Sequence, residues 1–132
     1  MPALYALVFA GTPERAMSVL GSWNESDRLW VAFANGLDYL FGVLLFGSLS
    51  LACTYAALRG GRWQRFGFAL AWAAWCGVLL DLPENASYLA MVRGSVSQPW
   101  PALALVTTSL RHLLFVTCLL FIALNARPSR AV

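Results

Sequence analysis

The stretch Asp81-Leu82-Pro83-Glu84-Asn85 lies inside residues 66–91, a run that is otherwise mostly apolar. Two carboxylates and a carboxamide therefore stand in a segment that has the length and composition of a helix crossing a lipid bilayer. An ionisable side chain in such a helix costs a few kcal/mol of insertion free energy, so it is kept where it has a partner or a task. This stretch predicts a membrane protein and marks where its key contacts lie.

The composition also favours a membrane protein. The chain has 132 residues, 60% of them hydrophobic and 11% charged, and its mean hydropathy is +0.67. Soluble domains carry about 25% charged residues, so this chain has less than half the usual share. The net charge of +3 depends on arginine alone, because the chain contains no lysine. The arginines flank apolar segments, which fits contact with lipid headgroups and argues against a nucleic-acid partner.

Three apolar runs are long enough to cross a bilayer, at about residues 29–58, 66–91 and 100–124. We therefore expect an all-α integral membrane protein with three transmembrane helices, forming one transmembrane domain over residues 1–132. Arginine counts give the orientation. The loop 59–65 and the C-terminal tail hold five arginines, whereas the N-terminal segment and the second loop hold three. The positive-inside rule then predicts a cytoplasmic C-terminus in a multi-pass membrane protein.

Residues 1–25 form an interfacial N-terminal segment in this scheme. Thr12 is placed to cap a short amphipathic helix, and Pro13 suits its first position. The apolar face of this helix is expected to lie on lipid and comprises Ala16, Met17, Leu20 and Trp23. Ser26 is the expected cap of the first span. The alternative is a four-helix transmembrane bundle with a further span over residues 2–23, which would bury two charged side chains near the bilayer centre.

Ionisable residues of the three spans fall at similar depths. With a helical rise of about 1.5 Å per residue, Asp38 and Glu84 lie about 8–9 Å to the outer side of their span centres, and Asp81 about 4 Å. Arg111 and His112 fall near the centre of the third span, from which an arginine can reach outward. Helical spacing adds Asn85 and Tyr88 to the same face as the two acids. The candidate functional cluster is Asp38, Asp81, Glu84, Asn85, Tyr88, Arg111 and His112.

Polar stripes on the other two spans agree with an inward-facing cluster. Asn35, Asp38 and Gly42 share one face of the first span, and Thr107, Thr108, Arg111 and Phe115 share one face of the third. Gly36, Gly42 and Gly47 offer small surfaces for close helix packing.

The cluster has two interpretations. In the structural one, Arg111 holds the helices together, or Asp81 caps a helix that restarts at Leu82 because Pro83 breaks the turn. In the functional one, the acids form a site for a ligand, a proton or a substrate. The excess of three carboxylates over one arginine and one histidine keeps the functional interpretation open.

Motifs for other chemistry are absent. The cysteines, one in each span at positions 53, 76 and 118, show no metal-binding or redox spacing, and His112 lacks an HExxH-like partner. We therefore predict no cofactor and no metal, and the sequence identifies no catalytic residue. With acidic residues in a small helical bundle, the chain loosely resembles the emopamil-binding and sterol-isomerase-like membrane proteins. The resemblance extends no further than residues 81–85, so no residue role is transferred.

Three functions remain. The first is a small polytopic membrane protein whose acidic, polar cluster binds a cation, a proton or a small amphipathic ligand. The second is an accessory subunit of a larger membrane complex, with other membrane subunits or a second copy as partner. The third is a small isomerase-like enzyme with Glu84 or Asp81 as general acid or base. A cavity lined by Tyr88, Trp72, Trp75 and the acids would favour the first or third, and a filled bundle the second.

Overall fold

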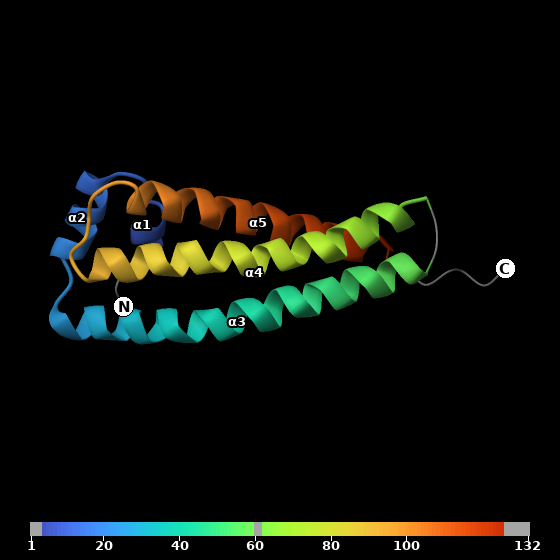
Figure 1. Ribbon diagram of the computed structural model, residues 1–132, viewed down its shortest axis with the longest axis horizontal. Helices are drawn as coiled ribbons and strands as arrows, with labels where there is room; N and C mark the ends of the chain where they lie inside the picture. The colour runs from blue at the N-terminus through green and yellow to red at the C-terminus, as the bar shows by residue number, and fades with distance from the viewer. Residues whose placement is uncertain (1–3, 60–61, 126–132) are drawn as a thin grey trace.

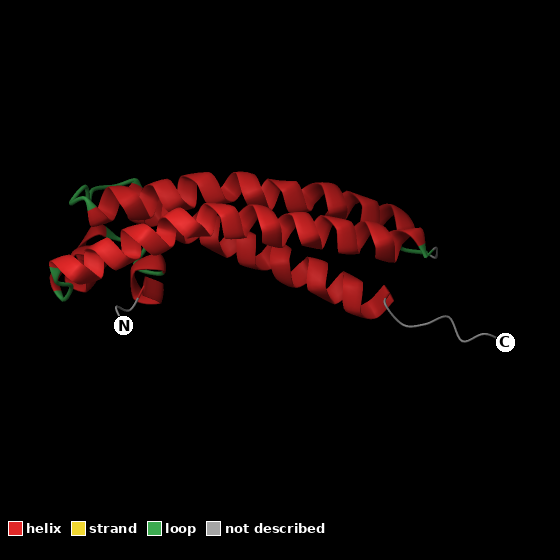
Figure 2. Ribbon diagram, turned by 90° about the horizontal axis from the view of Figure 1, so that it is seen from below, coloured by secondary structure: helices red, strands yellow, loops and turns green. Residues whose placement is uncertain are grey.

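The structure, a computed structural model, describes residues 4–59 and 62–125, and this part of the chain is helical without any strand. Three long helices lie side by side along the molecule, with two short ones gathered at one end (Figure 1). The elements are α1 (Leu4–Val8), α2 (Pro13–Gly21), α3 (Glu25–Leu58), α4 (Gln64–Val92) and α5 (Trp100–Asn125). Short connections join the long helices at alternate ends (Figure 2). Each of α3, α4 and α5 is long and apolar enough to cross a membrane, as the sequence predicts.

Glycines of α4 allow the long helices to approach one another closely around Phe46 and Phe121. A Cβ atom added at Gly77 of α4 would lie 2.5 Å from the ring of Phe46 on α3, and one at Gly67 would overlap the ring of Phe121 on α5. Phe46 and Phe121 belong to a buried apolar cluster that α3, α4 and α5 share. Of the glycines predicted to pack on α3, only Gly42 meets a neighbour, whereas a Cβ at Gly36 or Gly47 would enter open space.

The starts of α2 and α3 follow different capping residues. As predicted, Thr12 caps α2, where its side chain accepts a hydrogen bond from the Arg15 backbone and Pro13 opens the helix. The prediction of Ser26 as the cap of α3 is wrong. Asn24 Oδ1 accepts from the backbone N–H of Asp27 at 2.8 Å, and Asp27 Oδ2 accepts from that of Asn24 at 3.1 Å. This reciprocal capping box satisfies the first orphan donors and starts the helix at Glu25.

The N-terminal segment is two short helices and not a fourth span. α1 ends at Val8 and α2 begins at Pro13, and between them Gly11 adopts φ +66°, a left-handed conformation that glycine permits. The four-helix alternative is therefore wrong for the described residues. α1 and α2 together cover one end of the bundle (Figure 1).

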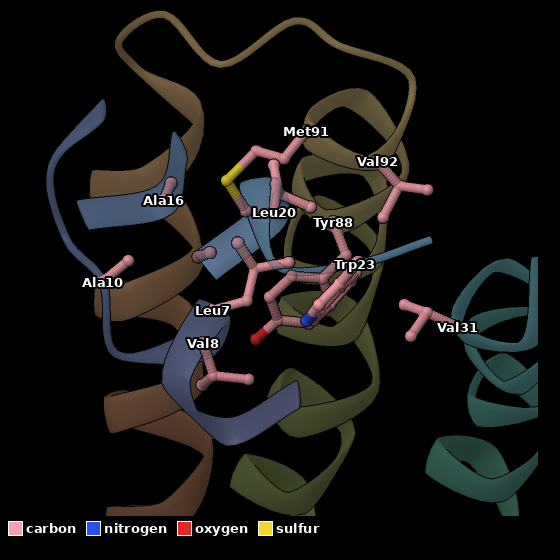
Figure 3. Close-up of a cluster of buried hydrophobic side chains, with 11 residues drawn as sticks. Leu7, Val8, Ala10, Ala16, Leu20, Trp23, Val31, Tyr88, Met91 and Val92 are labelled. Atoms are coloured by element: carbon pink, nitrogen blue, oxygen red, sulfur yellow. The ribbon is translucent and has the colours of Figure 1, made fainter. Parts of the chain in front are cut away.

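Most of the apolar face of this segment packs on protein, where the sequence analysis expected lipid. Leu20 and Trp23 are buried together with Leu7 of α1 against Tyr88 and Met91 of α4, and the same group is drawn in Figure 3. Met17 was expected on this face but is 53% exposed. The end of the bundle that carries α1 and α2 thus has its own apolar cluster, which includes Tyr88.

Helix α4 continues through Pro83 without a break. Asp81 is therefore an interior residue of the helix, and the alternative in which it caps a helix restarted at Leu82 is wrong. Ser87 lies one turn after Pro83, and its Oγ donates a hydrogen bond to the Pro83 carbonyl oxygen at 2.6 Å. The carboxylates on either side of Pro83 are consequently available to other helices.

Candidate functional site

Arg111 of α5 is the centre of the charged cluster. Its Nη1 atom donates hydrogen bonds to Asp81 Oδ1 and, at 2.8 Å, to Glu84 Oε2, both on α4. The same nitrogen lies 3.8 Å from Asp38 Oδ2 on α3. Four candidates from three helices are thus brought together around one guanidinium nitrogen. The Arg111 guanidinium carbon also lies 5.7 Å from the ring centroid of Phe46, within cation–π range.

The four charged side chains differ in exposure. Asp81 is 2% exposed and Glu84 8%, whereas Asp38 is 37% exposed. If all are ionised, three carboxylates against one guanidinium give a formal charge of 1 − 3 = −2. Fully ionised, the cluster would carry more negative charge than its own cation neutralises, and Asp38 is its most exposed acid.

Asp81 packs tightly against the backbone of α3. A Cβ atom built on Gly42 would lie 2.7 Å from Asp81 Oδ2 and 3.0 Å from its Cγ. The missing side chain at Gly42 therefore makes room for the carboxylate between α3 and α4. Glycine at this position explains how a charged group can remain in a closely packed contact of two helices.

A hydrogen-bond network links Glu84 to α5 through Tyr88. The Tyr88 hydroxyl donates to Glu84 Oε1 at 3.1 Å and lies 2.9 Å from Thr108 Oγ1 of α5. Since the Tyr88 proton goes to the carboxylate, Thr108 serves as the donor to Tyr88. Both oxygens of Glu84 thus accept hydrogen bonds. Thr108 was not among the candidate residues, although its spacing from Arg111 places both on the same face of α5.

Asn85 differs from its neighbours because its side chain has no partner. The residue is 1% exposed, and neither its Oδ1 nor its Nδ2 makes a hydrogen bond within residues 4–59 and 62–125. Asn35 of α3 donates to the Asn85 backbone carbonyl at 3.1 Å, which leaves the Asn85 carboxamide unused. Asn35, like Thr108, belongs to the site without having been a candidate residue.

His112 does not join the ion pairs. Its side chain is exposed, and Nδ1 lies 2.8 Å from the carbonyl of Thr108 on its own helix. The ring contributes to a cavity wall and not to the charged cluster.

A cavity of about 370 Å³ lies beside the cluster, walled by α3, α4 and α5, with α1 contributing at one end. Its polar lining is Asn35, Asp38, Glu84, Asn85, Tyr88, Thr108, Arg111 and His112. Its apolar lining is Val8, Val31, Ala34, Phe41, Leu45, Phe46 and Phe115, with Tyr5 also on the wall.

The cavity lining differs in two respects from the lining that would favour a ligand site or an enzyme. Trp72 and Trp75 do not line it, because they are 78% and 47% exposed on the outer surface of α4. Asp81 does not line it either, since its carboxylate is buried between Gly42 and Arg111. The cluster therefore has a buried part at Asp81 and a cavity-facing part that includes Asp38 and Glu84.

Comparison with known proteins adds no relative, since no family model, curated protein or solved structure matches the chain, and its function has to be inferred from this site.

Proposed function

We propose that the protein is a multi-pass membrane protein that binds a small amphipathic molecule with a cationic group. The observation that carries this proposal is the cavity beside Arg111, which combines acidic groups with an apolar wall. Its volume of about 370 Å³ falls in the usual range for small-molecule sites. A largely apolar pocket with a few convergent polar groups is also the common form of such sites.

Charge supports a cationic ligand. Arg111 interacts with Asp81, Glu84 and Asp38, so one cation faces three acids. The Asp38 carboxylate is the most exposed of the three and the furthest from Arg111, at 3.8 Å. An ammonium group beside Asp38 would reduce the negative excess without displacing the guanidinium. Asp38 is accordingly the proposed contact for the ligand cation, with Glu84 and Arg111 behind it.

The apolar wall supports an amphipathic ligand. Phe41, Phe46 and Phe115 line the cavity, and such rings offer large apolar contact areas to a hydrocarbon or aromatic group. Because α3, α4 and α5 have the length and composition of membrane spans, the cavity would lie at bilayer depth. A ligand dissolved in the lipid would then have direct access to it.

The accessory-subunit alternative is favoured by one observation, the buried ion pair of Asp81 and Arg111. We assign this pair the structural task of holding α4 on α5, which is compatible with a ligand site on the other side of Arg111. The isomerase-like alternative is less well supported. Both oxygens of Glu84 already accept hydrogen bonds, and Asp81 has no place on the cavity wall.

The test uses naphthylethylamine, a compact apolar amine, and its neutral relative naphthylpropanol. Purified protein in lipid nanodiscs is titrated with each compound while thermal unfolding is followed, since a ligand of the folded state raises the unfolding temperature. We expect stabilisation by the amine and little by the alcohol. Asp38→Asn should weaken amine binding about tenfold, in line with the loss of a charge-assisted hydrogen bond.

Ser87→Ala is the matched control, because Ser87 is a buried polar residue of α4 that does not line the cavity. It should bind the amine like the wild type. Equal stabilisation by amine and alcohol would contradict the cationic part of the proposal. No stabilisation by either compound would contradict the ligand site as a whole.

A further inference from the structure

The unpartnered carboxamide of Asn85 bears on what the ligand must contain. The residue lines the cavity and is 1% exposed, yet both polar atoms of its side chain lack a hydrogen bond within the described residues. Buried polar side-chain atoms nearly always have a partner, because an unsatisfied donor or acceptor keeps its full desolvation cost. Asn85 therefore lowers the stability of the unliganded protein unless something else binds it.

The neighbouring side chains are committed elsewhere. Asn35 donates to the backbone carbonyl of Asn85 and not to its side chain. Glu84 accepts from Tyr88 and Arg111, and Tyr88 also bonds to Thr108. The cavity is thus left as the place from which a partner for the Asn85 side chain can come.

We infer that the ligand carries, next to its cationic group, a second group that both donates and accepts a hydrogen bond, such as a hydroxyl or an amide. This inference rests on the proposed function and names the ligand class, an amphipathic amino alcohol or amino amide. A carboxamide presents an acceptor oxygen and a donor nitrogen side by side, which matches a group with both capacities.

The position of Asn85 in the site supports a short spacing between the two ligand groups. Asn85 follows Glu84 on α4 and is held to α3 through Asn35, one helical turn before Asp38. Residues one turn apart on a helix have Cβ atoms about 5–6 Å apart. The Asn35 side chain thus links the Asn85 backbone to the face of α3 that carries Asp38, and Asn85 and Asp38 line the same cavity, which favours a compact amino alcohol.

Two matched amines test the inference. Naphthylalaninol is naphthylethylamine with a hydroxymethyl group beside the amine, so the two differ only in the proposed hydrogen-bonding group. Binding of each to wild-type protein in nanodiscs is measured by calorimetry. We expect naphthylalaninol to bind about tenfold more tightly, the effect of one hydrogen bond to a buried polar group.

The variant Asn85→Leu supplies the second measurement. Leucine has the same number and branching of side-chain heavy atoms as asparagine but no polar atoms, so the preference for naphthylalaninol over naphthylethylamine should disappear. The unliganded variant should also unfold at a higher temperature than the wild type, because an unsatisfied buried group has been removed. The control Ser87→Ala removes a hydrogen bond to Pro83, so it should unfold earlier and keep the preference.

The outcomes separate this inference from the proposed function. Equal binding of both amines by the wild type would overturn the role of Asn85 and leave the cationic site standing, as would be seen if a water molecule occupied the carboxamide. A preference that survives Asn85→Leu would overturn it too. If neither amine binds, the ligand site itself fails and the inference fails with it. A variant too unstable to purify would contradict the expected stabilisation.

Discussion

Replacing Arg111 by methionine should destabilise the protein far more than neutralising any one of the carboxylates around it. The reason is the shared nitrogen, because Nη1 interacts with Asp81, Glu84 and Asp38 at once. In Asp81→Asn, the amide oxygen still accepts a hydrogen bond from Arg111, and two acids remain as counter-charges. The loss is then one charge-assisted bond exchanged for a neutral one, about 1 kcal/mol.

Arg111→Met has the opposite consequence. Asp81 and Glu84, which are 2% and 8% exposed, would remain buried without any cation. Breaking a buried ion pair from one side costs about 3–5 kcal/mol. The arginine variant should therefore be less stable than Asp81→Asn by about 2–4 kcal/mol, a gap wide enough to measure.

The assay is reversible unfolding in mixed micelles, titrated with a denaturing detergent and followed by circular dichroism. The triple variant Arg111→Met, Asp81→Asn, Glu84→Gln serves as control. It should recover part of the lost stability, since no buried carboxylate is then left without its cation. If Arg111→Met proves as stable as Asp81→Asn, then Arg111 is not the common partner of the acids, and the central geometry of the site is refuted.

Two further predictions concern packing and topology. Gly42→Ala should cost about 1–3 kcal/mol, because its Cβ would lie 2.7 Å from Asp81 Oδ2, whereas Gly36→Ala, with open space around it, should not destabilise the protein. Equal effects of the two alanines on detergent-induced unfolding would argue against the tight contact at Asp81. Cysteines placed at Gln64 and Ser97 should react with an impermeant thiol reagent from opposite sides of the membrane, with Gln64 cytoplasmic. Gln64 begins α4, and Ser97 follows the other end of α4 in the connection to α5, so labelling of both from one side would contradict the proposed orientation.

Length and helical spacing predicted the parts of the structure that depend on them directly. The three long helices follow from apolar runs of sufficient length. The meeting of Asp81, Glu84 and Arg111 follows from their depth in the spans and their shared helix faces. An acid inside an apolar helix requires a partner, and the chain offers few cations at that depth.

The remaining features depend on which face of each helix packs against another helix. The apolar pattern alone does not distinguish a face that contacts protein from one that contacts lipid. Trp72 and Trp75 are apolar whether they line a cavity or face outward. For the same reason, the burial of Leu20 and Trp23 against α4 was not visible in the sequence. The start of α3 was missed because both Asn24 and Ser26 are good caps, and only the reciprocal bond with Asp27 distinguishes them.

In the membrane-spanning arrangement proposed above, the position of Arg111 in α5 has a consequence for how the chain would insert. Arg111 follows Glu84 by 27 residues, so α3 and α4 are synthesised with their acids before the cation exists. An acid at the very centre of a spanning helix costs about 2.5–3.5 kcal/mol on insertion scales, which is the upper limit for acids that lie off the centre, as these do. The α3–α4 hairpin is therefore unstable in lipid until α5 packs against it. A chain that stops before α5 should be retained by the insertion machinery or degraded, and the addition of one helix should release it.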